Sequence, residues 1–95
     1  MIHLNILLQV KDPNDVEKVK GLLSEQGRLS REEPGCVRFE VYHSANDPTM
    51  FILNEWWESQ PALDEHRKAK AYTTVYQPHV IPLVNRTPHP CALVE

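Results

Sequence analysis

Three polar side chains interrupt apolar patterns in this chain, and they are the residues best suited to carry chemistry. His66 lies on the apolar side of a predicted helix, Glu55 lies in the middle of an apolar strand face, and Asn5 interrupts the mixed face of the first predicted strand. Histidine titrates near neutral pH, so it can act as a base or a proton relay. An amide can donate to an oxygen that becomes anionic. With nearby aromatic residues, His66 and Asn5 are typical of a small apolar pocket with two polar groups.

Each of these residues also has a purely structural interpretation. An isolated histidine on an apolar helix face is more often a hydrogen-bonded core residue than a catalyst. Glu55 could hold the following turn or a subunit contact, because a buried carboxylate is costly unless it is paired. Trp57, Tyr72 and Tyr76 could wall a small apolar pocket with a few polar groups, or belong to an ordinary core. The residue pattern alone leaves these alternatives open.

No motif for a metal or a bound cofactor is present. The chain has no phosphate loop, nucleophile elbow or dinucleotide fingerprint. Its five histidines and two cysteines lack the spacing of a metal-ligand set, and His89-Pro90-Cys91 is the nearest approach. We therefore expect no metal and no cofactor.

Length and composition predict one small domain over residues 1–95. The chain is 41% hydrophobic with a net charge of −3, which suits a packed core and gives no basic surface for nucleic acid. No apolar run has the roughly 20 residues of a membrane span, and the N-terminus does not resemble a signal peptide. Two cysteines are too few for a disulfide framework, so we expect reduced thiols and a cytoplasmic protein.

Hydrophobic periodicity predicts the elements that must position these residues. Strict alternation predicts strands over 2–10, 36–43 and 50–57, and the middle one has Val37, Phe39 and Val41 on one face. Asp12 and Ser59 are predicted to cap two helices. A further helical stretch is expected over 74–84, followed by a loop over 86–90 and a short strand over 91–94. This order predicts an α+β, ferredoxin-like βαββαβ fold, an antiparallel sheet with helices on one face.

The opposite face of that sheet is expected to be apolar and bare in a single chain. Large exposed apolar faces usually mark an interface. A second sheet packed against this face would cover it, so we predict a homodimer.

Several short motifs in a fixed order resemble the antibiotic biosynthesis monooxygenase family. The motifs are Glu33-Pro34-Gly35-Cys36, Phe39, Asp47-Pro48-x-x-Phe51-x-Leu53-x-Glu55-x-Trp57 and Ala62-Leu63-x-x-His66. The resemblance covers nearly the whole chain and implies a dimeric α+β barrel. It also implies cofactor-free oxidation of an electron-rich aromatic, such as a quinol or an anthrone, by O2. For that activity the candidate catalytic residues are His66, as the base or proton relay, and Asn5, as the donor to the anionic oxygen.

Two positions depart from patterns seen among relatives. Ala71 stands where many members have a second histidine before the aromatic residue, which does not fit a two-histidine relay. In the haem-degrading branch a tryptophan and an iron-ligating histidine stand at the positions of His66 and Tyr76, so haem is not expected.

Two other functions remain open on the sequence alone. One is an isomerase or processing enzyme for a small hydroxy-ketone of the autoinducer-2 type, with Arg38 or Lys68 as candidate phosphate contacts. The other is a non-catalytic ligand-binding dimer, because this scaffold does not fix function. Oxygen consumption with quinols and anthrones would distinguish the leading hypothesis from both.

Overall fold

A four-stranded antiparallel sheet is the centre of the computed structural model, which describes residues 1–95. Its strands are β1 (Ile2–Val10), β2 (Cys36–His43), β3 (Met50–Trp57) and β4 (Val84–Cys91), in the order β2-β3-β1-β4. In β1, residues Leu4, Ile6, Leu8 and Val10 are buried on one face, as the alternation predicts. The predicted α+β, ferredoxin-like arrangement is confirmed.

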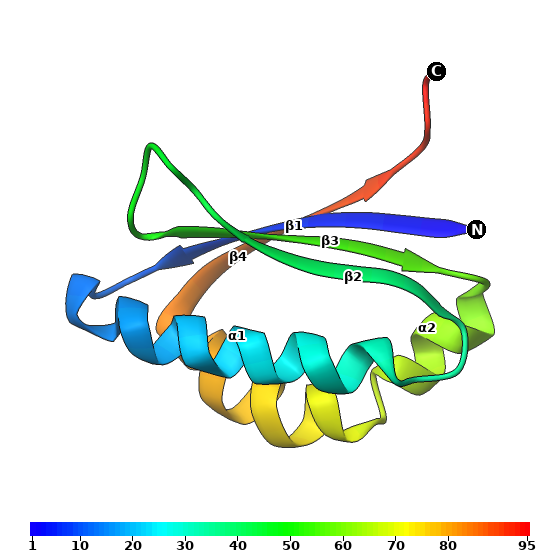
Figure 1. The fold of residues 1–95 in the computed structure, drawn as a ribbon, viewed down its shortest axis with the longest axis horizontal. Helices are drawn as coiled ribbons and strands as arrows, with labels where there is room; N and C mark the ends of the chain where they lie inside the picture. Colours follow the sequence, from blue (N-terminus) through cyan, green and yellow to red (C-terminus); the bar gives the residue numbers. More distant parts are fainter.

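The helices all lie on one face of this sheet (Figure 1). They are α1 (Val16–Arg31) after the 3₁₀ turn η1 (Pro13–Asp15), α2 (Gln60–His66), the π-helix η2 (Ala71–Val80) and the 3₁₀ turn η3 (Ile81–Leu83). Asp12 caps η1 by accepting from the N–H of Asn14, and Ser59 caps α2 by accepting from the N–H of Ala62. None of these helices combines the length and apolar character needed to cross a bilayer.

The C-terminal region differs from the sequence prediction. The third helical stretch begins at Ala71 and ends at Leu83, and the predicted loop over 86–90 is part of β4. Residues 92–95 continue without regular structure, so the predicted strand over 91–94 is wrong. Pro88 and Pro90 are tolerated because β4 is an edge strand, pairing only with β1. Their spacing of two residues directs both ring nitrogens to the same, unpaired edge.

Two further features differ from the prediction: β2 contains a bulge, and the sheet face opposite the helices carries polar side chains among the apolar ones. Cys36 pairs with Trp57 but Arg38 pairs with Trp56, so the intervening Val37 is extra and 51% exposed. The face of the sheet opposite the helices is also more polar than predicted. There His3 Nε2 lies 2.7 Å from Asn54 Oδ1, and Asn54 Nδ2 donates to Glu40 at 2.9 Å.

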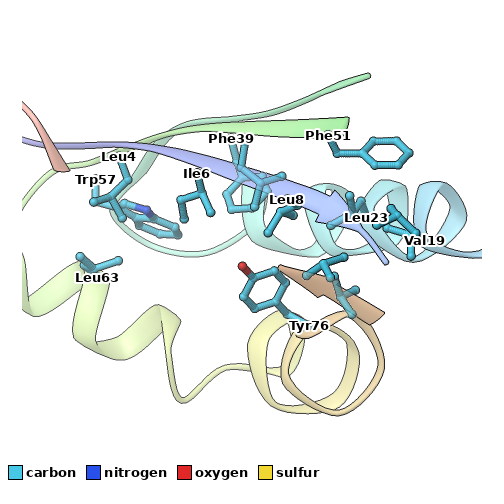
Figure 2. Packing of buried hydrophobic residues seen from close by; sticks show 14 residues of the cluster. Leu4, Ile6, Leu8, Val19, Leu23, Phe39, Phe51, Trp57, Leu63 and Tyr76 are labelled. Atoms are coloured by element: carbon cyan, nitrogen blue, oxygen red, sulfur yellow. The ribbon is translucent and has the colours of Figure 1, made fainter. Parts of the chain in front are cut away.

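The hydrophobic core fills the space between the sheet and the helices. Fourteen buried residues form one cluster that includes Val19 and Leu23 of α1, Leu63 of α2 and Tyr76 of η2. Figure 2 shows the Tyr76 ring beneath the sheet with its hydroxyl directed toward the strands. A hydroxyl group therefore enters the layer between the sheet and the helices.

The turn between α1 and β2 depends on Gly35, which has a φ of +83°. A Cβ there would lie 2.5 Å from the Cβ of Ala62, so the turn packs directly on α2. We predict that Gly35→Ala lowers the free energy of unfolding by about 2 kcal/mol, from backbone strain and this clash. Gly21→Ala is the control, since its Cβ would meet nothing within 4 Å. Because Gly21 lies within α1, Gly21→Ala should raise the free energy of unfolding by about 0.5–1 kcal/mol. Urea unfolding measures both, and equal stability of wild type and Gly35→Ala would refute the prediction.

Candidate active site

His66, the last residue of α2, is held in a cage of aromatic rings and is only 4% exposed. The centroid of its ring lies 4.4 Å from that of Trp57 and 5.9 Å from those of Phe39 and Tyr72. Its Nδ1 lies 2.8 Å from Glu33 Oε1, in the turn after α1. This carboxyl group fixes the orientation of the ring, and His66 Nε2 has no hydrogen-bond partner within the chain.

Burial sets the protonation states of this pair. Burial, together with nearby Arg67, lowers the pKa of His66 to about 4, so its imidazole is neutral at pH 7. Burial and the neighbouring Glu55 raise the pKa of Glu33 to about 7. An ionised Glu33 can accept hydrogen bonds but cannot donate one. His66 therefore donates to it through Nδ1–H, and the lone pair of the neutral imidazole is on Nε2.

Glu55 lies on the helix-facing side of β3 and is 3% exposed. It accepts a hydrogen bond of 3.1 Å from Trp57 Nε1. Burial raises its pKa to about 7, although the bond from Trp57 and the charges of Arg86 and Arg67 oppose the rise. A buried carboxyl that titrates near neutrality is a common feature of catalytic sites.

Tyr76 and Arg86 complete the polar groups beneath the sheet. Arg86 Nε donates to the Tyr76 hydroxyl at 2.8 Å, and its guanidinium carbon lies 5.9 Å from the centroid of the Tyr76 ring. Burial raises the pKa of Tyr76 to about 12, so its hydroxyl stays protonated. The Tyr72 and Tyr76 ring centroids are 5.3 Å apart, which links this pair to the His66 cage.

Two cavities meet at His66. The interior cavity has a volume of about 10 Å³, and Glu55, Tyr72, Tyr76 and Arg86 line it with His66. The outer cleft, between the turn after α1 and helix α2, has a volume of about 460 Å³ and is lined by Glu33, Pro34, Gly35, Glu58, Pro61, Ala62, Glu65, His66 and Ala69. The interior cavity has room for about one water molecule, whereas the outer cleft is in the size range of ligand sites.

The structure brings together five of the six predicted site residues. Glu55, Trp57, His66, Tyr72 and Tyr76 lie in one cluster beneath the sheet. Asn5 lies on the opposite face, where its Nδ2 is 3.3 Å from His3 Nε2 and 3.8 Å from Cys91 Sγ. The predicted proximity of Asn5 to His66 within one chain is therefore wrong, because Asn5 has the opposite parity in β1 to the buried Leu4 and Ile6.

Three residues of this cluster were missed by sequence reasoning. Arg86 falls in the segment that was predicted to be a loop, and Glu33 was noted only as part of the Glu33-Pro34-Gly35-Cys36 motif. Gln26 is 1% exposed, lines the interior cavity, and has no hydrogen-bond partner for its buried Oε1. A signal for Gln26 does exist, because it continues the helical spacing of Val19 and Leu23 as a polar residue on that apolar face.

A family model and several solved structures resemble this chain. The model of the antibiotic biosynthesis monooxygenases matches residues 1–77. A solved structure of a candidate antibiotic biosynthesis monooxygenase from Nitrosomonas europaea has a TM-score of 0.89 and 25% identity, and the match covers 100% of both chains. The Rv0793 protein of Mycobacterium tuberculosis has a TM-score of 0.86 and 26% identity over 100% of this chain and 97% of its own.

Two further likenesses are either lower in sequence identity or shorter. A mutant of SnoaB, a cofactor-independent oxygenase from Streptomyces nogalater, shares the fold with a TM-score of 0.77 at 12% identity, covering 99% of this chain and 93% of its own. An uncharacterized protein of Synechocystis is 38% identical over 37 residues, which are 39% of this chain. The matched segment spans only 25% of the length of that curated relative.

Proposed function

The chain belongs to the antibiotic biosynthesis monooxygenase family, and from this premise we propose that it oxidises a small, electron-rich aromatic compound with O2 and without a cofactor. The substrate would be a quinol or an anthrone-like phenol. The observation that carries the proposal is His66, a neutral and buried base oriented by Glu33 at 2.8 Å and surrounded by aromatic rings.

The first step is removal of a proton from the substrate. With Glu33 ionised, His66 Nε2 holds a free lone pair and takes the proton of a phenolic hydroxyl or an acidic C–H. The resulting imidazolium lies against the Glu33 carboxylate, which stabilises its charge. The Arg86 guanidinium, whose Nε donates to the Tyr76 hydroxyl at 2.8 Å, lines the interior cavity that His66 also lines.

The second step is the reaction of the substrate anion with oxygen. Closed-shell organic molecules react slowly with O2, but an electron-rich anion is a strong enough reductant to transfer an electron to it. For an anthrone-like substrate, a CH2 group becomes a carbonyl. The second oxygen atom leaves as water with the two hydrogens of that CH2 group, one of them returned by His66. The aromatic rings packed around His66 limit the access of water to the base.

Oxygen uptake with a panel of hydroquinones and anthrones tests this function. The purified chain, treated with a chelator, should consume O2 faster than the spontaneous reaction with at least one substrate. Mass spectrometry with ¹⁸O2 should place one labelled oxygen in the product. Failure with every compound, in folded protein, would favour a non-catalytic binding function.

The rate is also predicted to depend on pH through Glu33. Below about pH 7 Glu33 is protonated and can donate a hydrogen bond to His66 Nδ1. The single hydrogen of the neutral imidazole is then on Nε2, so Nε2 has no lone pair with which to accept a proton from the substrate. The rate should therefore rise as pH increases through about 7. Glu33→Gln has no titrating carboxyl here and should lack this rising limb. Initial rates from pH 5 to 9 on both proteins measure the effect, and an identical limb in Glu33→Gln would exclude Glu33 as its origin.

We further propose that two chains pair through the sheet face opposite the helices. Leu7, Ile52 and Trp56 are half-buried there, and His3 stacks on Trp56 with ring centroids 4.5 Å apart. Trp56→Glu is expected to shift the protein toward monomer at micromolar concentration, because it places a charge in the contact. Light scattering should give twice the 11.0 kDa chain mass for wild type. A wild-type mass near that of one chain would contradict the pairing.

A further inference from the structure

We propose that the outer cleft beside α2 is the binding site for the substrate ring, and that its carboxylates select an uncharged aromatic over one bearing a phosphate or carboxylate. This inference rests on the proposed function for the identity of the ligand. The binding itself can be tested without turnover.

Size favours the outer cleft over the interior cavity. The interior cavity, at about 10 Å³, has no room for an aromatic ring, whereas the cleft has a volume of about 460 Å³. His66 lines both spaces, so a ring in the cleft lies beside the imidazole without displacing the core. Pro34, Pro61 and Ala69 supply apolar wall on the sides of the cleft.

A buried polar group lies at the base of the cleft. His66 is 4% exposed, and its Nδ1 is occupied by Glu33 while its Nε2 has no partner within the chain. A substrate hydroxyl is a suitable partner for this nitrogen, because a hydroxyl can donate a hydrogen bond to the free lone pair of a neutral imidazole. The cleft therefore combines apolar walls with a small number of polar groups, as ligand sites usually do.

Charge restricts what the cleft can accept. Glu33, Glu58 and Glu65 line it, and no lysine or arginine does. Lys68 approaches Glu65 at 3.4 Å but lies on the exposed surface with 72% of its side chain accessible. A ligand phosphate or carboxylate would meet like charges without a cationic partner, so phosphorylated hydroxy-ketones are poor candidates for this site.

The test compares 1,4-hydroquinone with 2,5-dihydroxybenzoate, which is the same ring with a carboxylate, under nitrogen. Dissociation constants come from NMR chemical-shift titration of the folded chain. We expect hydroquinone to shift the amides of Gly35, Ala62 and Glu65. Charge repulsion should make 2,5-dihydroxybenzoate bind at least about 10-fold more weakly. The double variant Glu58→Gln/Glu65→Gln, altered only at exposed side chains, should narrow this gap to less than about 3-fold.

A second variant tests the site by filling it. Ala69→Leu adds bulk to the cleft wall and should weaken hydroquinone binding at least about 10-fold, whereas Ala45→Leu, the same change on the exposed β2–β3 hairpin, should not. Unchanged binding in folded Ala69→Leu, shifts confined to Tyr76 and Arg86, or equal affinity for both ligands would overturn the proposal. Hydroquinone binding as expected, with no oxygen uptake by any substrate, would support the cleft and reject the oxygenase function.

Discussion

Replacing His66 by glutamine is expected to lower the rate of oxygen uptake by roughly 100-fold, the usual scale of general acid–base catalysis. The substitution keeps much of the structural role, because a glutamine amide can still donate to Glu33, the partner at 2.8 Å. It removes the titratable base, because an amide cannot take a proton near neutral pH. Lost packing and an altered hydrogen bond should cost about 1–2 kcal/mol of stability.

The control for this prediction is His79→Gln, the same chemical change at an exposed position of η2. It should leave both oxygen uptake and melting temperature close to wild type. The two His66 interpretations then separate, since a purely structural histidine predicts a lower melting temperature with an unchanged rate per folded molecule. A folded His66→Gln protein with wild-type turnover would remove His66 from the mechanism.

The local rules of the sequence predict most of the fold. Alternation in β1 and β3 and the caps at Asp12 and Ser59 agree with the structure, because each signal depends on a few neighbouring residues. The central position of β3 follows from its largely apolar faces. These features do not depend on tertiary context.

The errors occur where tertiary context overrides local preference. Pro88 and Pro90 indicate a loop, but at a sheet edge the missing N–H groups cost nothing in pairing with β1. Arg86 was not predicted as a site residue, because it lies in the segment that was expected to be a loop. In the structure it is the hydrogen-bond partner of Tyr76.

The candidate site was predictable in its residue types more than in its geometry. His66, Glu55 and the aromatic residues stand out because they break or enlarge an apolar pattern. Asn5 breaks a pattern as well, but the parity of β1 decides the face on which it lies, and that parity was readable in the sequence. The outer cleft was not predictable, because it depends on how the turn at Gly35 packs against Ala62.

Replacing Glu55 by glutamine is expected to raise the free energy of unfolding, relative to wild type, more at alkaline pH than at acidic pH. In the folded chain, burial raises the pKa of Glu55 from the ordinary 4.5 to about 7. Below pH 4.5 this group is protonated in the folded and unfolded states, so its titration costs nothing. Between pH 4.5 and 7 the unfolded chain loses this proton while the folded chain keeps it, and wild-type stability falls as pH rises. Above pH 7 this titration lowers the free energy of unfolding of the wild type by about 3 kcal/mol.

Glutamine does not titrate, so the variant escapes this penalty and can still accept the bond from Trp57 Nε1. The stability of Glu55→Gln minus that of wild type should thus increase by about 3 kcal/mol from pH 4.5 to pH 8, measured by urea unfolding. Loss of the Glu55 charge also removes one cause of the raised pKa of Glu33, which adds in the same direction. His66 contributes the opposite slope, since its lowered pKa makes stability rise with pH between about 4 and 6.5, but it is present in both proteins.

Glu17→Gln, at an exposed position of α1, is the control and should show no such increase. A pH-independent difference between Glu55→Gln and wild type would mean that Glu55 is ionised in the folded protein near its ordinary pKa, and would remove it as a proton-holding group beneath the sheet.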